Sequence, residues 1–166
     1  VPLRNDLTFD RLPFIQDTFL TIGMAKVATS AFEARDMGFL RANDGITFDR
    51  AALVSNAKAD VIHLASTGYV PPRDADFFIL PGRSGAAVID AALYSMQLGG
   101  QLSAHDRLIG KKLARVLTGG DTDGRSPVSE QTLLDLEREV FLSLCGEEKT
   151  LARIQHMLNT GKPLRN

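Results

Sequence analysis

One stretch constrains the fold of this chain more than any other. The run from Gly85 to Leu98 is apolar nearly all round, and only Asp90 and Gln97 share a thin polar line along it. A helix of this kind is normally surrounded by other helices or by another subunit. Its alanines allow neighbouring helices to approach closely. We therefore expect it to be the central packing helix of an all-α fold.

The rest of the sequence supplies the helices that would surround it. Apolar residues recur at helical spacing in segments that end at glycine or proline, and no segment shows the convincing alternation of a half-buried strand. Ser30 and Ser103 are each followed three residues later by an acidic residue, which is the capping-box pattern. The pattern predicts six or seven helices in a single domain, residues 1–166.

Two expected helices carry the histidines that need an interpretation. The helix expected from Asp49 to about Thr67 has an apolar stripe that we assign to the core, formed by Leu53, Ala57, Val61, Leu64 and Ala65. His63 lies off that stripe and is expected to face solvent or to support another group. His105 borders the apolar face of the helix that follows Ser103. We expect it to be a satisfied structural residue rather than a base.

The segment Ser129–Gly146 predicts an amphipathic helix with serine as N-cap and Gly146 as a left-handed stop. Glu137 falls in the middle of its apolar stripe. A carboxylate there is costly to bury unless it is paired or accepts good hydrogen bonds. We expect Glu137 to be a buried structural carboxylate that ties this helix to a neighbour.

Composition excludes several classes of protein. The net charge is −1, with 44% hydrophobic and 23% charged residues, so there is no electrostatic footprint for nucleic acid or anionic lipid. The single cysteine, Cys145, excludes an internal disulfide and a cysteine-rich metal site, and it fits a reducing cytoplasm. No apolar run is long enough for a membrane span. The first residue is Val1, from which we expect a piece of a longer polypeptide.

One loop has metal-ligand spacing. In Gly119–Glu130, the residues Asp121, Asp123, Gly124 and Glu130 fit the third, fifth, sixth and twelfth positions of an EF-hand calcium loop. The first position is glycine, which offers no side-chain ligand. The alternatives are an ordinary linker between helices and a stand-alone helical binding module with a degenerate calcium loop. We assign no metal ligand.

Other local motifs of catalysis are missing from the sequence. It has no glycine-rich phosphate loop, no Gly-x-Ser-x-Gly elbow and no His-Glu-x-x-His. The Arg83–Gly85 segment, at an expected helix start, is either a plain N-terminus or a place where backbone amides hold an anion. We assign no catalytic residue.

Two stretches together resemble the C-terminal part of the enoyl-CoA hydratase (crotonase-like) region of multifunctional β-oxidation proteins. The first is Ala25–Leu40, with its Ala-x-x-Ala-x-x-Met-Gly pattern. The second is Leu136–Phe141 with Thr150 and the closing His156–Asn166. Residues 14–166 as a whole, including Leu117–Asp121, are similar to the end of long 3-hydroxyacyl-CoA dehydrogenases.

This resemblance implies a C-terminal helical region of an NAD-dependent enzyme that oxidises 3-hydroxyacyl-CoA thioesters in fatty-acid β-oxidation. The family's catalytic glutamates, oxyanion hole and nicotinamide-binding loop lie upstream of the matched stretches. The resemblance therefore implies that this chain is inactive alone and binds no NAD. It also implies that the chain packs against upstream domains or a second copy. By the match of its tail, Lys162 is the one residue assigned to CoA contact.

Overall fold

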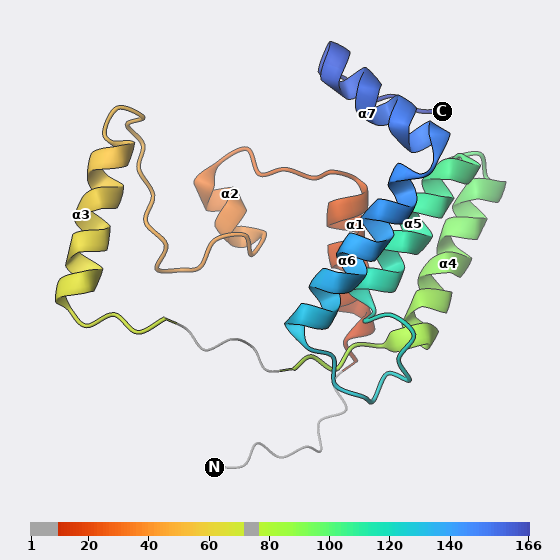
Figure 1. Ribbon diagram of the computed structural model, residues 1–166, viewed down its shortest axis with the longest axis horizontal. Helices are drawn as coiled ribbons and strands as arrows, with labels where there is room; N and C mark the ends of the chain where they lie inside the picture. Colours follow the sequence, from red (N-terminus) through yellow and green to blue (C-terminus); the bar gives the residue numbers. More distant parts are fainter. Residues whose placement is uncertain (1–9, 72–76) are drawn as a thin grey trace. The chain divides into compact units, whose positions relative to one another are not determined.

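The computed structural model describes residues 10–71 and 77–166, so parts of the predicted single domain lie outside the described residues. Along the described residues run seven α-helices (Figure 1). They are α1 Leu12–Gly23, α2 Ala31–Asp36, α3 Leu53–Ser66, α4 Gly82–Leu98, α5 Ala104–Leu117, α6 Glu130–Cys145 and α7 Glu148–Thr160. The β-pairing found there is limited to an isolated antiparallel bridge between Phe78 and Val128. The all-α prediction is confirmed.

These helices fall into two compact units. Among the described residues, unit 1 takes 10–25 and 77–166 and so contains α1 and α4 to α7; unit 2 takes 26–71 and contains α2 and α3. Two compact units can still belong to one folding domain. The single domain spanning 1–166 therefore stays a prediction.

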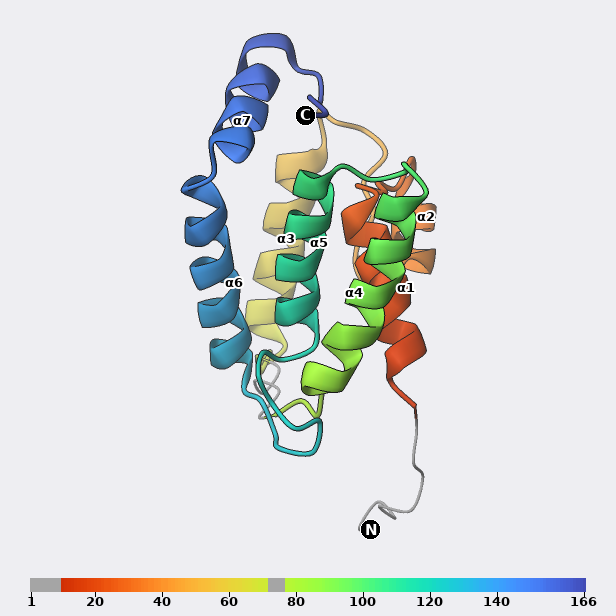
Figure 2. The same ribbon diagram turned by 90° about the vertical axis from the view of Figure 1, so that its right-hand side faces the viewer.

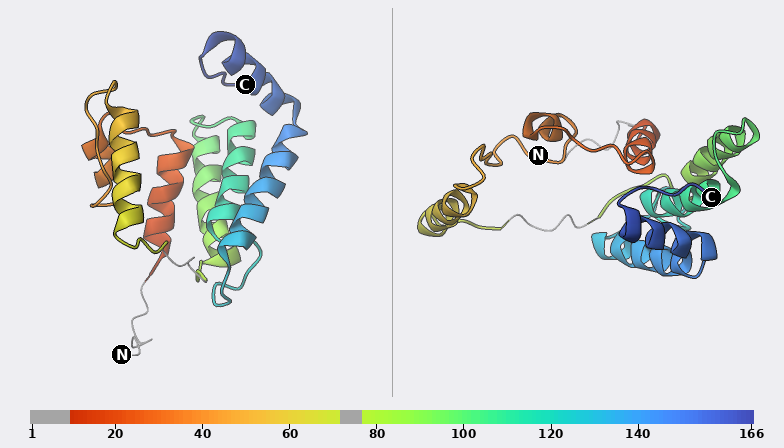
Figure 3. Two further views of the ribbon diagram at one scale, coloured as in Figure 1. Left: turned by 60° about the vertical axis from the view of Figure 1, so that its left-hand side comes forward. Right: turned by 90° about the horizontal axis from the view of Figure 1, so that it is seen from above.

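The core of unit 1 is built around α5, which packs against α4, α1 and α6. Figures 2 and 3 show α4, α5 and α6 running side by side. Gly110 lets α4 approach α5, because a Cβ at this position would lie only 2.7 Å from Leu93 Cδ1. Around this contact lies a buried apolar cluster made of Phe19, Ile89, Leu93 and Ala114.

The structure differs from the sequence prediction in which helix is central. On α4 the buried residues are Gly82, Gly85, Ile89 and Leu93, which lie on one side of the helix. The opposite side leaves Val88, Tyr94 and Leu98 exposed, the last to 71%. The apolar composition of α4 favours burial on every side, but the described residues of unit 1 cover only one side.

The helix boundaries of unit 1 follow local chemistry. Ser103 and Asp106 form a complete capping box at α5, and Ser129 Oγ accepts the Thr132 backbone N–H at α6. Gly146 follows α6 with φ −76°, so the prediction of a left-handed stop there is wrong. The chain enters α7 almost at once and leaves it through Gly161, whose φ of 67° is left-handed.

Unit 2 is much less covered. Ser30 Oγ accepts the Glu33 N–H at the start of α2, as expected of a cap, and the rings of Phe32 and Phe48 lie 6.2 Å apart. Helix α3, however, has no buried residue. The stripe assigned to the core is exposed, with Leu53 at 52% and Val61 at 65%. That core assignment is wrong, because spacing shows which residues share a face and not whether another element covers it.

Candidate functional site

A polar cluster joins the start of α5 to α7. The Asp106 carboxylate accepts the Ser103 N–H at 3.0 Å and the Arg153 Nη1–H at 2.8 Å. Arg153 comes from α7, and both side chains are largely buried. Although burial opposes ionisation of Asp106, the hydrogen bonds from Ser103 and Arg153 hold its pKa below the usual value. The pair therefore stays charged and fixes α7 to the bundle.

The same arginine also holds the end of the chain. Its Nε–H donates to Asn166 Oδ1 at 2.8 Å, and Asn166 Nδ2–H donates to the Lys149 carbonyl at 3.2 Å. We call Asp106, Arg153 and Asn166 the α7 clasp. Residues 162–166 are thus folded back toward the beginning of α7.

His105 lies beside the clasp and is 5% exposed. Its Nε2 is 3.0 Å from Thr150 Oγ1. Burial, followed by the nearby positive charges of Arg153 and Lys149, lowers the pKa of its imidazole. A buried, neutral ring whose Nε2 is bonded to the Thr150 hydroxyl is a satisfied histidine, as the sequence predicts. That it is structural rather than a base stays a prediction.

A second polar cluster lies between α4 and α5. Asp90 Oδ1 accepts hydrogen bonds from Arg107 Nε at 3.0 Å and Nη2 at 2.8 Å, and Lys111 Nζ lies 3.5 Å from Asp90 Oδ2. The Arg107 guanidinium also sits 4.7 Å from the ring centroid of Tyr94 and 3.5 Å from Gln97 Oε1. The polar line on α4 thus has partners on α5, and the cluster joins these two helices.

The interpretation of Glu137 is wrong: its side chain is exposed. Helix α6 meets α5 along a line centred on Val140, the one buried residue of the helix, so the contact is narrower than the apolar stripe. Glu137 and Phe141 lie on its uncovered edge. The carboxylate that does join α6 to α5 is Glu139, whose Oε1 accepts Arg115 Nη1–H at 2.7 Å.

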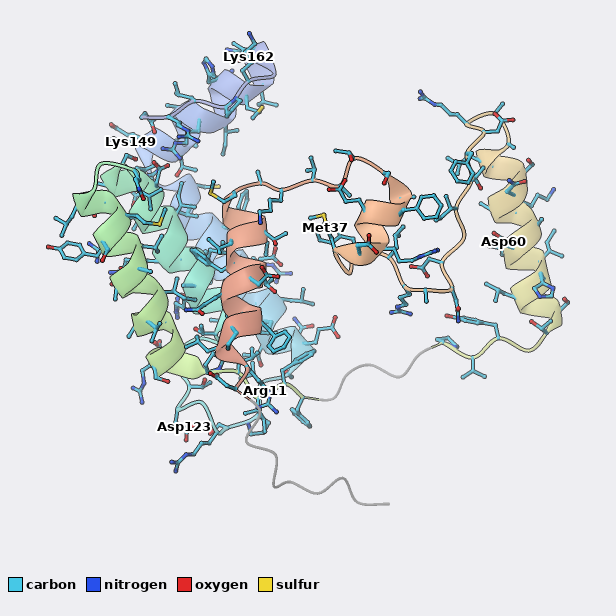
Figure 4. The ribbon with its side chains drawn as sticks, turned by 180° about the vertical axis from the view of Figure 1, so that it is seen from behind. Arg11, Met37, Asp60, Asp123, Lys149 and Lys162 are labelled. Carbon is cyan, nitrogen blue, oxygen red and sulfur yellow. The ribbon has the colours of Figure 1, made fainter. Side chains whose placement is uncertain are left out.

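The loop from Gly119 to Glu130 is organised by its own backbone (Figure 4 labels Asp123 within it). Asp123 Oδ1 accepts the backbone N–H groups of Arg125 at 2.9 Å and Ser126 at 2.8 Å. These bonds, that of Ser126 first, lower the pKa of Asp123 to about 2. In the described part of the chain, which includes this whole loop, no three His, Cys, Asp or Glu side chains gather as a metal site would require. The choice between an ordinary linker and a degenerate calcium loop stays a prediction.

The end of α5 and the same loop together bond to the N-terminus of α4. The Gly82 N–H donates to the Thr118 carbonyl at 2.8 Å, and the Arg83 N–H donates to the Thr122 carbonyl at 3.0 Å. Gly82 has φ 59°, and a Cβ there would collide with the Thr122 carbonyl oxygen. Backbone carbonyls of the chain therefore already accept the two N–H groups that an anion would need. This favours a plain helix N-terminus over an anion site.

Lys162 lies just past the end of α7, whereas Lys149 lies at its start (Figure 4). The side chain of Lys162 is exposed, and its backbone N–H donates to Thr160 Oγ1 at 3.2 Å. Its assignment to CoA contact stays a prediction. The clasp that folds this tail back was missed in the sequence, because Arg153 and Asp106 are 47 residues apart and only the capping aspartate hinted at a partner.

The chain is similar to a "Probable 3-hydroxyacyl-CoA dehydrogenase" of Bacillus subtilis (strain 168). The two are 46% identical over 149 residues, which is 90% of this chain and 19% of that protein. The chain thus spans about a fifth of the length of the curated relative it matches. No family model and no solved structure matches it. None of the described helices combines the length and apolar character that crossing a membrane requires.

Proposed function

We propose that this chain is the C-terminal helical part of a 3-hydroxyacyl-CoA dehydrogenase of fatty-acid β-oxidation. The observation that supports this most is the 46% identity over 149 residues to the B. subtilis protein. The complete enzyme would use NAD and CoA thioesters in the cytoplasm, and it would carry an enoyl-CoA hydratase-like region ahead of this part. The chain itself would have a packing, assembly or CoA-covering role and no catalytic residues of its own.

A supporting role agrees with the chemistry of the described residues. The buried histidine is bonded to Thr150, and the two polar clusters join helices to each other. Several helices of unit 1 leave large apolar side chains exposed, among them Leu98, Phe141 and Leu158. Such surface is typical of contacts with further protein.

Replacement in the relative tests the proposal. The matched segment of the B. subtilis protein is exchanged for this chain, and NADH formation from a 3-hydroxyacyl-CoA is compared with the unmodified protein and with a deletion of the segment. We expect the exchange to preserve activity and the purified chain alone to form no NADH. An inactive, well-folded exchange protein, or NADH formed by the chain alone, would refute the proposal.

The CoA contact is tested in the same exchange protein. The Lys162→Ala substitution is expected to raise the KM for the CoA thioester about threefold to tenfold and to leave kcat unchanged, because a lost contact to bound CoA removes uniform binding. Lys26→Ala, at another exposed lysine, is the control. Equal KM values for the two variants would show that Lys162 does not contact CoA.

A further inference from the structure

Helix α3 presents an apolar face for which unit 2 offers no cover. An open apolar strip runs along it, formed by Leu53, Val54, Ala57, Lys58, Val61 and Ile62, and we call this set the α3 face. Val54 is 79% exposed and Val61 65% exposed. Lys58 is the one charged residue of the set. The face therefore fits an apolar surface with an acidic group at its rim.

A helix in this situation needs a partner beyond unit 2. It has 14 residues, no buried side chain, and Ala52 as an N-cap without a side-chain hydrogen bond. Helices shorter than about 15 residues are marginal in water, and in proteins they depend on packing of their apolar face. Neither capping nor packing within unit 2 supplies that stabilisation.

The size of the face indicates what kind of partner covers it. At 1.5 Å per residue the helix is roughly 21 Å long. One side of it offers less than the area of about 800 Å² per partner that a stable interface between separate molecules needs. A partner on the same polypeptide does not face this limit, because the linkage keeps its effective concentration near millimolar.

About four fifths of the B. subtilis relative lies outside the matched segment. We infer that the α3 face docks against that remaining part of the dehydrogenase polypeptide, through an apolar surface that faces Val61 and an acidic group that meets Lys58. This rests on the proposed function, and it adds to it the residues that make the contact between this part and the rest of the enzyme.

Hydrogen exchange in the exchange protein described above tests the inference. We expect α3 amides to be protected at least about tenfold more in that protein than in the purified chain. Val61→Asp places a charge in the contact and should abolish the added protection. Ala59→Asp places the same charge on the opposite side of the same helix, and it should retain the protection.

The other outcomes are informative. Equal α3 exchange in the chain and in the exchange protein would overturn the inference. So would α3 protection already present in the purified chain and lost in Val61→Asp, because the cover would then be this chain or a second copy. Loss of NADH formation together with intact α3 protection would count against the proposed function alone.

Discussion

The two units of this protein have similar sequence patterns but differ in how far they bury them. Leu93 of α4 and Leu53 of α3 both lie on apolar stripes at helical spacing, yet Leu93 is 5% exposed and Leu53 is 52% exposed. Unit 1 brings α4 against α5 through Gly110 and closes a core, whereas unit 2 leaves its longest helix without cover. An apolar stripe thus shows which face of a helix favours burial. Whether that face is buried depends on the elements around the helix.

The largest contrast is expected from the same substitution in both units. Leu93→Ala should lower the free energy of unfolding by about 3 kcal/mol, because it leaves a cavity in the core of unit 1. Leu53→Ala should change it by less than about 0.5 kcal/mol, because an exposed side chain leaves no cavity. Urea denaturation followed by circular dichroism measures both. Similar losses would show that the stripe of α3 is buried in solution.

A second contrast uses two glycines with positive φ. Gly82→Ala in unit 1 should cost about 2 kcal/mol, because the new Cβ meets the Thr122 carbonyl in addition to the backbone strain. Gly68→Ala, after α3, has φ 73° with no atom within 4 Å of the new Cβ, so about 1 kcal/mol of strain remains. Thermal unfolding of both variants provides the comparison. A cost for Gly68→Ala as large as that for Gly82→Ala would argue for close packing around Gly68.

The α7 clasp is expected to stabilise the packing of α7 against the rest of unit 1. Arg153→Met should destabilise the protein by about 1 to 2 kcal/mol, because it leaves the Asp106 carboxylate without its charged partner. Arg138→Met removes an exposed pair with Asp135, at 3.9 Å, and should cost less than about 0.5 kcal/mol. Limited proteolysis should cut near α7 in the first variant only. Identical cleavage patterns would mean that the clasp does not hold the helix.

The smallest expected effect is a dependence of stability on pH. The pKa of His105 is lowered from its ordinary value near 6.5, so the unfolded state binds more protons at mildly acidic pH. The stability that neutral His105 contributes to the folded state is therefore complete above about pH 6.5. It is lost as the pH falls from there toward the lower pKa of the folded state. The urea midpoint of unfolding, measured across that pH range, should therefore fall as the pH falls. His105→Gln should make the midpoint depend less steeply on pH.

His63→Gln, at an exposed position on α3, is the control for that experiment and should leave the slope in place. A slope that persists in His105→Gln would show that another group titrates in this range.

Local chemistry explains what could be predicted from the sequence. The caps at Ser30, Ser103 and Ser129 depend on residues a few positions apart, and the sequence shows them directly. The starts of α5 and α6 follow from these signals. The burial of His105 and its bond to Thr150 also agree with its predicted place at the edge of an apolar face.

The errors concern features that depend on distant partners. Glu137 was expected to be buried because the stripe of α6 is wide, but the contact with α5 is narrow and leaves it exposed. The clasp joins residues 47 apart, and no local pattern identifies Arg153 as the partner of Asp106. The exposed stripe of α3 belongs to the same class, because no local signal shows whether a covering element exists.

The contrast between the two units can be tested most directly by native-state hydrogen exchange on the purified chain. Amides of α4 and α5 that are hydrogen-bonded beside Leu93 and Ala114 should exchange only through global unfolding. Amides of α3 should exchange at close to the rate of an unfolded chain. Protection of α3 equal to that of α5 would contradict the account, because α3 would then be covered without the rest of the enzyme.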